Sequence, residues 1–365
     1  MRNASALTSP SPGDSNNNGL PIRLMVVDDS ITARTIYSRI IERETDLELS
    51  AVAGTAEDAL ALLREVQVDV ILLDLEMPGM GGLEALPKMI ADARGAQVMV
   101  ISSLTIAGAE HTLNALALGA ADTLPKPPPG KFDQDYRNGL VEKIRGLGVA
   151  ARRAMRTKQP QRPPPIAVRP GSKNKAQVLA IGASTGGIHA LGRLFAGLPP
   201  RIHIPILITQ HLPESFMEVF ARQLKIVSGR EAIVAENGTV LVPDQILIAP
   251  GHSHMRVVAK GKQHIVQLDD APAVSSCRPS VDPMFQSIAS VFGSHALGVV
   301  LSGMGRDGSI GAQEIVNAGG TVLAQDQATC AVWGMPGAVA MAGLASSVLP
   351  PEQLASRIVA SRDGV

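Results

Sequence analysis

The stretch Gln177 to Gly187, QVLAIGASTGG, decides the fold of the second half of the chain. Its apolar part, Val178–Ile181, predicts a buried strand, and the small residues after it predict a tight turn into a helix. The turn carries the pattern G-x-S-x-G with Ser184 at its centre. Such a turn exposes a serine hydroxyl at the edge of a sheet, and the N–H groups of the next helix suit an oxyanion. The pattern alone leaves two interpretations open, a nucleophile and a phosphate-binding turn.

The composition is that of a globular chain of about two domains. Of 365 residues, 45% are hydrophobic, 18% are charged and only 2% are aromatic, so aliphatic side chains must form the cores. Lys+Arg and Asp+Glu balance at 33 each, which argues against nucleic acid or a membrane as a partner. We find no signal peptide and no membrane-spanning run, and we expect Cys277 and Cys330 to be free thiols. The expectation is a cytoplasmic protein with a disordered tail over residues 1–20.

Residues 21–131 alternate short apolar runs with helical periodicity. This alternation predicts an α/β domain of flavodoxin-like type, with five strand-and-helix repeats and a parallel sheet. The predicted strands are Ile22–Val27, Leu49–Ala53, Val68–Leu73, Gln97–Ile101 and Asp122–Leu124.

Polar side chains follow these strands where each one ends. Asp28 and Asp29 come after the first strand, Asp74 after the third, Ser102 after the fourth and Lys126 after the fifth. Because the carboxyl ends of parallel strands share one edge of a sheet, these groups should meet there. Clustered carboxylates prefer a hard cation such as Mg²⁺, and a lysine with a hydroxyl can hold phosphoryl oxygens.

The segments VVDDS, LLDLEMPGMGG, ISS and LPKP resemble the receiver domain of two-component response regulators. The resemblance implies that Asp74 accepts a phosphoryl group from a sensor histidine kinase, and that Ser102 and Lys126 contact the phosphoryl oxygens. One departure is Thr123, three residues before Lys126, where the family usually has an aromatic switch residue. The Mg²⁺ ligands that the resemblance implies are Asp29, Asp74 and the Glu76 carbonyl, with Asp28 assisting.

Residues 132–175 differ in composition from their surroundings. Phe132–Arg145 is predicted to complete a receiver helix. From Arg152 to Lys175 there are five Arg, three Lys and no acidic residue, and repeated prolines prevent regular structure. This segment is interpreted as an extended basic linker, either a solvated tether or a docking site for an acidic partner.

Residues 176–365 are predicted to form a second α/β domain, a doubly wound parallel sheet. A β-rich excursion is expected between Glu231 and Leu268, and a helix over Ser309–Asn317. The predicted strands are Val178–Ile181, Ile204–Thr209, Gln245–Ile248, Leu297–Leu301, Thr321–Ala324 and Ser347–Leu349.

A nucleophilic serine needs a base, and the base needs an orienting carboxylate. His211 follows the strand after Ser184, and Asp307 follows the strand LGVVLSG. All three residues therefore fall at strand ends on one edge of the predicted sheet, where they can converge. No histidine follows His295, which disfavours an α/β-hydrolase proper, whose histidine comes last.

The segments IGASTGG, QHLP, APGHSHM, RPSVDPMF, LSGMGRDG and WGMPGAV resemble the catalytic domain of chemotaxis protein-glutamate methylesterases of the CheB type. The resemblance implies Ser184 as nucleophile, His211 as general base and acid, and Asp307 as its orienter. It implies an oxyanion hole formed by the backbone N–H groups of Met304 and Thr185. No metal or cofactor is expected at this site.

The same resemblance supplies a substrate, a control and two partners. Ser184 would attack glutamate methyl esters on chemoreceptors, and the same machinery could deamidate glutamines, because both reactions pass through a tetrahedral oxyanion. The unphosphorylated receiver would pack over the Ser184 edge and block access. The implied partners are methyl-accepting receptors as substrates and a histidine kinase as phosphodonor.

Four alternatives compete with parts of this interpretation. A DNA-binding second domain lacks a helix-turn-helix pattern, and a dinucleotide turn would need a second glycine where Ser184 stands. Cys277 as an alternative nucleophile has no base near it in sequence. His252 and His254 have ligand-like spacing for zinc but no evident third ligand, and His254 is expected to support its loop instead.

Overall fold

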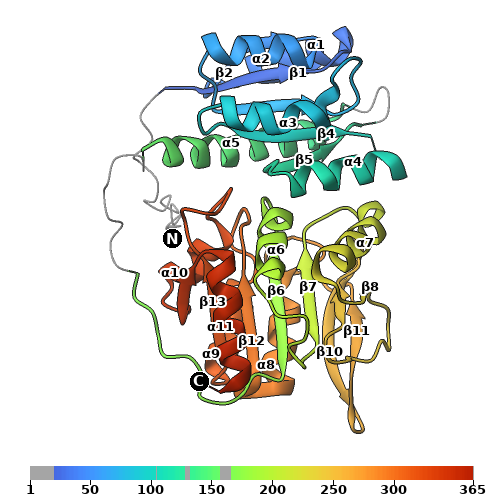
Figure 1. The fold of residues 1–365 in the computed structure, drawn as a ribbon, viewed down its shortest axis with the longest axis vertical. Helices are drawn as coiled ribbons and strands as arrows, with labels where there is room; N and C mark the ends of the chain where they lie inside the picture. The colour runs from blue at the N-terminus through green and yellow to red at the C-terminus, as the bar shows by residue number, and fades with distance from the viewer. Residues whose placement is uncertain (1–19, 104, 128–131, 157–165, 365) are drawn as a thin grey trace, which may run out of the picture.

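The computed structural model describes residues 20–103, 105–127, 132–156 and 166–364. The predicted disordered tail, apart from Leu20, and part of the predicted linker lie outside these ranges. The described residues form two α/β domains, stacked as Figure 1 shows, with the receiver sheet above the second sheet.

The first domain has a five-stranded parallel sheet, as the sequence predicts, and its strands lie in the order β2-β1-β3-β4-β5. Its central strands β1, β3 and β4 are mostly buried runs of apolar residues, as expected for a parallel sheet covered on both faces. Helices α2, α3 and α4 cover one face, and α1 and α5 cover the other. The elements are β1 Ile22–Val27, α1 Ile31–Glu42, β2 Leu47–Ala53, α2 Ala56–Glu65, β3 Val70–Asp74, α3 Gly81–Asp92, β4 Gln97–Ser102, α4 Ile106–Ala117, β5 Asp122–Pro125 and α5 Gln134–Arg156.

The second domain has a seven-stranded parallel sheet in the order β14-β13-β12-β6-β7-β9-β8. Helices α6, α7 and α11 pack on one face, and α8, α9 and α10 on the other. The elements are β6 Val178–Ala183, α6 Gly187–Ala196, β7 Ile206–Gln210, η1 Glu214–Phe216, α7 Met217–Ser228, β8 Ala232–Val234, β9 Ile246–Ile248, β10 His254–Lys260, β11 Gln263–Asp269, α8 Val281–Phe292, η2 Gly293–His295, β12 Ala296–Val300, α9 Ser309–Asn317, β13 Thr321–Gln325, α10 Met335–Met341, β14 Ser347–Leu349 and α11 Pro351–Asp363.

The β-rich excursion is confirmed. It contributes β8 and β9 to the large sheet and the separate antiparallel pair β10–β11. This pair packs against α8 on the face of the sheet away from α6.

Helix α5 differs from the prediction, which ended it at Arg145. The helix continues to Arg156, so the first residues assigned to the linker are helical. Two glycines in the added part allow close packing: a Cβ on Gly146 would lie 2.1 Å from Cε of Met304, and one on Gly148 would lie 2.5 Å from Cγ2 of Ile22. The glycines therefore bring the helix against both domains.

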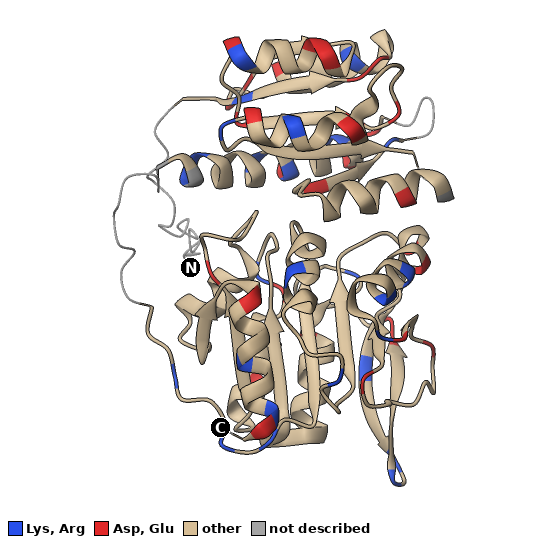
Figure 2. Ribbon diagram, in the orientation of Figure 1, with Lys and Arg blue, Asp and Glu red and all other residues tan. Residues whose placement is uncertain are grey.

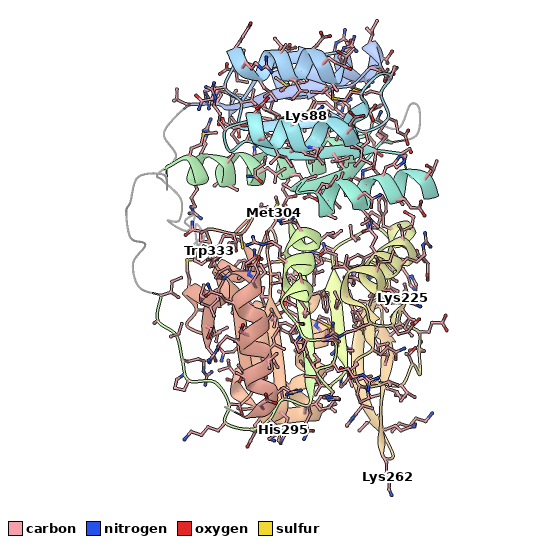
Figure 3. The ribbon with its side chains drawn as sticks, viewed as in Figure 1. Lys88, Lys225, Lys262, His295, Met304 and Trp333 are labelled. Atoms are coloured by element: carbon pink, nitrogen blue, oxygen red, sulfur yellow. The ribbon has the colours of Figure 1, made fainter. Side chains whose placement is uncertain are left out.

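The two domains share apolar contacts through α4, β5 and α5, which lie at the boundary in Figure 1. One cluster of buried side chains runs from α4 into the layer of α6 and α7. A second joins the α1 and α5 side of the receiver to Val332 and its partly buried neighbours Met304 and Ala331. Figure 3 shows Met304 and Trp333 at the end of the second domain that faces the receiver.

Two surface properties bear on the predicted partners. Figure 2 shows positively and negatively charged residues interspersed along the receiver helices. Among the residues that the structure describes, none of the helices has the length and apolar character that crossing a membrane requires.

Candidate functional site

The turn after β6 places Ser184 at the carboxyl end of the large sheet. Its backbone is fixed by hydrogen bonds on both sides: Ser184 N–H donates to the Ser302 carbonyl at 3.0 Å, and Gly187 N–H donates to the Ser184 carbonyl at 2.7 Å. Gly186 has a φ of +76°, and a Cβ there would lie 2.7 Å from Ser302 Oγ. Glycine is therefore required for the sharp entry into α6.

His211 and Asp307 lie where the sequence predicts, next to this turn. His211 follows β7 and Asp307 follows β12, and both strands pair directly with β6. His211 Nε2 is 2.8 Å from Asp307 Oδ2. Ser184 and His211 line the same small cavity, although no hydrogen bond joins their side chains in the described part of the chain. Such bonds are often long in a resting site and shorten when substrate binds.

Asp307 is held by more than the histidine. Ser280 Oγ donates to Asp307 Oδ1 at 2.6 Å, and Val281 N–H donates to Oδ2 at 2.7 Å. Burial disfavours the charged carboxylate, but the hydrogen bonds from His211 and Ser280 dominate and lower the pKa of Asp307. Ser280 also caps α8, so the start of that helix fixes the carboxylate.

The electrostatics of His211 follow from the same contacts. Burial disfavours the imidazolium, but the hydrogen bond to Asp307 and the nearby Cys277 sulfur raise the pKa of His211 to about 9. Because Nε2 is engaged by Asp307, Nδ1 is the ring nitrogen left to accept a proton from Ser184.

Sequence reasoning missed two contacts of this site. Gln210 is buried, and its Nε2 donates to the Ser184 carbonyl at 2.9 Å. Cys277, which has no base near it in sequence, has one in space: its sulfur, a ring nitrogen of His211 and an Asp307 oxygen all lie within 4.8 Å of one another. No spacing rule signals a contact between residues so far apart in the chain.

The other predicted residues also have clear positions. Gly303 lies against Ser184, since a Cβ on Gly303 would be 2.9 Å from Ser184 Cβ, and this places Met304 one residue beyond. His254 is buried and supports its loop, because its ring contacts the Ala271 carbonyl and Ser280 N–H, both at 2.9 Å. His252 instead pairs with Glu214 at the surface.

The receiver covers this edge of the sheet. Gly186 N–H donates to the Ala121 carbonyl at 2.6 Å, and Thr185 Oγ1 donates to Asp122 Oδ2 at 2.6 Å. The remaining cavity between Ser184, His211 and the receiver has a volume of about 10 Å³. That is room for at most one water molecule, so no ester group fits in this arrangement.

The polar groups predicted at the edge of the receiver sheet do converge. Carboxylate oxygens of Asp28, Asp29 and Asp74 lie within 4.8 Å of one another. Lys126 Nζ is 2.5 Å from Asp74 and 3.3 Å from Asp28 Oδ2, which is buried and accepts no hydrogen bond from the described residues. Burial raises the pKa of Asp74, although the ion pair with Lys126 opposes this. Three carboxylates and an oxygen without a hydrogen-bond donor fit Mg²⁺.

Two further residues complete this region. Ser102 is buried, and its Oγ accepts a hydrogen bond from Thr112 Oγ1 of α4 at 2.6 Å. Glu76 N–H donates to Asp74 Oδ1 at 3.1 Å. Thr123, at the position of the usual aromatic switch, is buried with a hydroxyl that has no partner among the described residues.

Comparison with known proteins identifies both halves. Residues 24–134 match the family model of the response regulator receiver domain, and residues 179–358 match that of the CheB methylesterase. The chain is 41% identical to a protein-glutamate methylesterase/protein-glutamine glutaminase of Nitrobacter hamburgensis, covering 97% of each chain. It is 46% identical to a second such enzyme, of Caulobacter vibrioides, covering 91% of this chain and 96% of that one.

A solved structure is similar to the second domain. The methylesterase catalytic domain of Thermotoga maritima CheB is 34% identical, with a TM-score of 0.49, and covers 51% of this chain and 98% of that one.

Proposed function

The chain belongs to the CheB family of protein-glutamate methylesterases/protein-glutamine glutaminases, which act in chemotaxis adaptation under the control of a receiver domain, and we propose that Ser184, His211 and Asp307 form its esterase centre. The observation that carries the proposal is the contact between His211 and Asp307, 2.8 Å long, at the strand end beside the Ser184 turn. A serine, a histidine and a buried carboxylate in this arrangement are the parts of a nucleophilic acyl transfer.

The reaction follows from these positions. Ser184 Oγ attacks the γ-carbonyl of a glutamate methyl ester while His211 takes its proton. His211 then gives that proton to the leaving methanol, and water hydrolyses the acyl-enzyme by the reverse sequence. A glutamine side chain would release ammonia through the same steps. Asp307 holds the ring and stabilises its charged form.

The oxyanion formed at each step needs donors close to Ser184. The backbone N–H groups of Thr185, at the start of α6, and Met304, which follows the Gly303 contact, are the candidates. Neither N–H donates a hydrogen bond to another residue in the described ranges. Free donors next to the nucleophile suit an oxyanion hole.

The receiver supplies the control. Phosphorylation would occur on Asp74, from a histidine kinase, with Lys126 and Ser102 holding the phosphoryl oxygens. Mg²⁺, held by Asp29, Asp74 and the Glu76 carbonyl beside Asp28, would supply charge neutralisation. The substrates would be methyl-accepting chemoreceptors, met in the cytoplasm.

Two short connections link this site to the esterase edge. Strand β5 begins at Asp122, which accepts a hydrogen bond from Thr185, and Lys126 follows directly after its other end. Ser102 contacts Thr112 of α4, the helix whose end accepts a hydrogen bond from His189 at 3.0 Å. Movement of Ser102 or Lys126 toward a phosphoryl group would strain both connections between the domains. The population would then shift toward an arrangement in which the receiver no longer covers Ser184.

The test is methanol release from methylated receptors by the full chain, with and without a small-molecule phosphodonor. The wild type should release methanol faster after phosphorylation, and Ser184→Ala should lose hydrolysis in both conditions. A Ser184→Ala chain with full activity would move the nucleophile elsewhere, with Cys277 the first residue to examine.

A further inference from the structure

Three side chains of different chemistry meet at the esterase edge: a thiol, an imidazole and a carboxylate. Cys277 comes from the loop before α8, His211 from the end of β7 and Asp307 from the turn before α9. Their sulfur, ring nitrogen and carboxylate oxygen lie within 4.8 Å of one another. The triad chemistry uses the imidazole and the carboxylate but gives the thiol no task.

This set of donors suits zinc. Zn²⁺ binds sulfur at about 2.3 Å and nitrogen or oxygen at about 2.0–2.2 Å in a tetrahedral arrangement. Ligand atoms in such a site are therefore separated by roughly 3.3–3.8 Å. The three ligand atoms already lie within 4.8 Å of one another. His211 Nε2 and Asp307 Oδ2, now 2.8 Å apart, need only separate slightly, and the half-buried Cys277 side chain can adjust by rotation.

The surroundings hold the ligands as the outer shell of a metal site does. Ser280 Oγ and Val281 N–H fix the Asp307 carboxylate at 2.6 and 2.7 Å. Ser275 Oγ accepts a hydrogen bond from Cys277 N–H at 3.3 Å. The other cluster of acidic ligands in the described part of the chain, at Asp28, Asp29 and Asp74, offers oxygen alone and suits Mg²⁺ instead.

We propose that His211, Cys277 and Asp307 form a site for Zn²⁺ and that the bound ion reversibly inhibits the esterase. The inhibitory part rests on the proposed function. The metal takes the place of the proton that His211 and Asp307 share, the thiol proton goes to solvent, and the ring keeps a proton on Nδ1. A ring held in this way cannot accept the proton of Ser184, so hydrolysis stops until the metal leaves.

Direct binding is tested with Co²⁺ on the full chain, in excess Mg²⁺ and phosphodonor. Mg²⁺ then occupies the receiver site, and phosphorylation opens the esterase edge. A thiolate–cobalt charge-transfer absorption should appear in the wild type, in Ser184→Ala and in Cys330→Ser, and added Zn²⁺ should abolish it. Cys277→Ser should lack this absorption. Its absence from the wild type, or its persistence in Cys277→Ser, would refute the site.

Inhibition is tested in the methanol assay, with each variant compared with its own metal-free rate. Zn²⁺ should inhibit the wild type and Cys330→Ser, and a chelator should restore both. Cys277→Ser should need at least about 10-fold more Zn²⁺ for the same inhibition, since loss of even an outer-shell partner costs that much. Equal sensitivity of both cysteine variants would refute the inhibitory role. Cobalt binding by a wild type that hydrolyses nothing would refute the esterase assignment and leave the metal site standing.

Discussion

The two candidate sites use the same structural device but differ in access. Each lies at the carboxyl edge of a parallel sheet, where polar residues follow buried strands. In the receiver, Asp29 is exposed and Lys126 is partly exposed. At the esterase edge, the receiver leaves a cavity of about 10 Å³ beside Ser184. In the proposed mechanism, a phosphodonor would reach the receiver site through this exposed side while the esterase is closed.

The largest expected effect concerns the closed site. Replacing Asp307 by Asn should lower ester hydrolysis by the phosphorylated chain about 10⁴-fold, because the imidazole loses its orienting carboxylate and takes the wrong tautomer. Methanol release measures this. Loss of less than about 10-fold would remove Asp307 from the triad.

The same variant tests the electrostatics of His211. Its pKa should fall from about 9 toward the ordinary value of 6.5, as followed by NMR of the ring protons. A raised folded-state pKa stabilises the folded chain fully below pH 6.5, and this contribution is lost as the pH rises through about 9. The free energy of unfolding should therefore fall with pH over this window more steeply in the wild type than in Asp307→Asn. Equal slopes would contradict the pairing.

Removing the receiver domain should have the next largest effect on ester hydrolysis. A fragment without residues 1–175 should hydrolyse receptor esters roughly 10–100-fold faster than the unphosphorylated chain, the usual size of such coupling. It should not respond to phosphodonor. A folded fragment without activity would show that the receiver completes the site instead of blocking it.

The sequence predicts the two sheets better than it predicts the contact between the two domains. Strand positions follow from apolar runs that end in glycine or polar residues, and Ile22–Val27 and Ser347–Leu349 are predicted to the residue. Helix α5 was predicted too short, because its glycines pack closely against Met304 and Ile22, which only the folded chain shows.

The same distinction applies to the sites. Strand order places Ser184, His211 and Asp307 on one edge, so their convergence could be predicted from the sequence. The approach of Cys277 to His211 and of Asp122 to Thr185 could not, because loops and domain docking bring them together and no periodicity encodes either.

Loss of the buried hydrogen bond between Asp122 and Thr185 should have an intermediate effect on ester hydrolysis. Replacing Asp122 by Ala leaves the Thr185 hydroxyl without its partner, at a cost of about 1–3 kcal/mol to the closed arrangement. Basal hydrolysis should rise roughly 5-fold or more. Lys143→Ala is the matched control, since it removes the other partner of Asp122 Oδ2 and keeps the hydrogen bond to Thr185. A similar rise in both variants would mean that the receiver itself is disturbed.

The smallest effect is expected at the exposed rim of the same interface. Glu110 of α4 pairs with Arg222 of α7 at 2.9 Å, but both side chains are more than half exposed. Such a pair contributes about 0–1 kcal/mol, since water screens the charges. Glu110→Gln should therefore change basal hydrolysis by less than about 3-fold, and added salt should remove the difference. A rise as large as that of Asp122→Ala would mean that the exposed ion pair, and not the buried Asp122–Thr185 hydrogen bond, keeps the receiver over the esterase site.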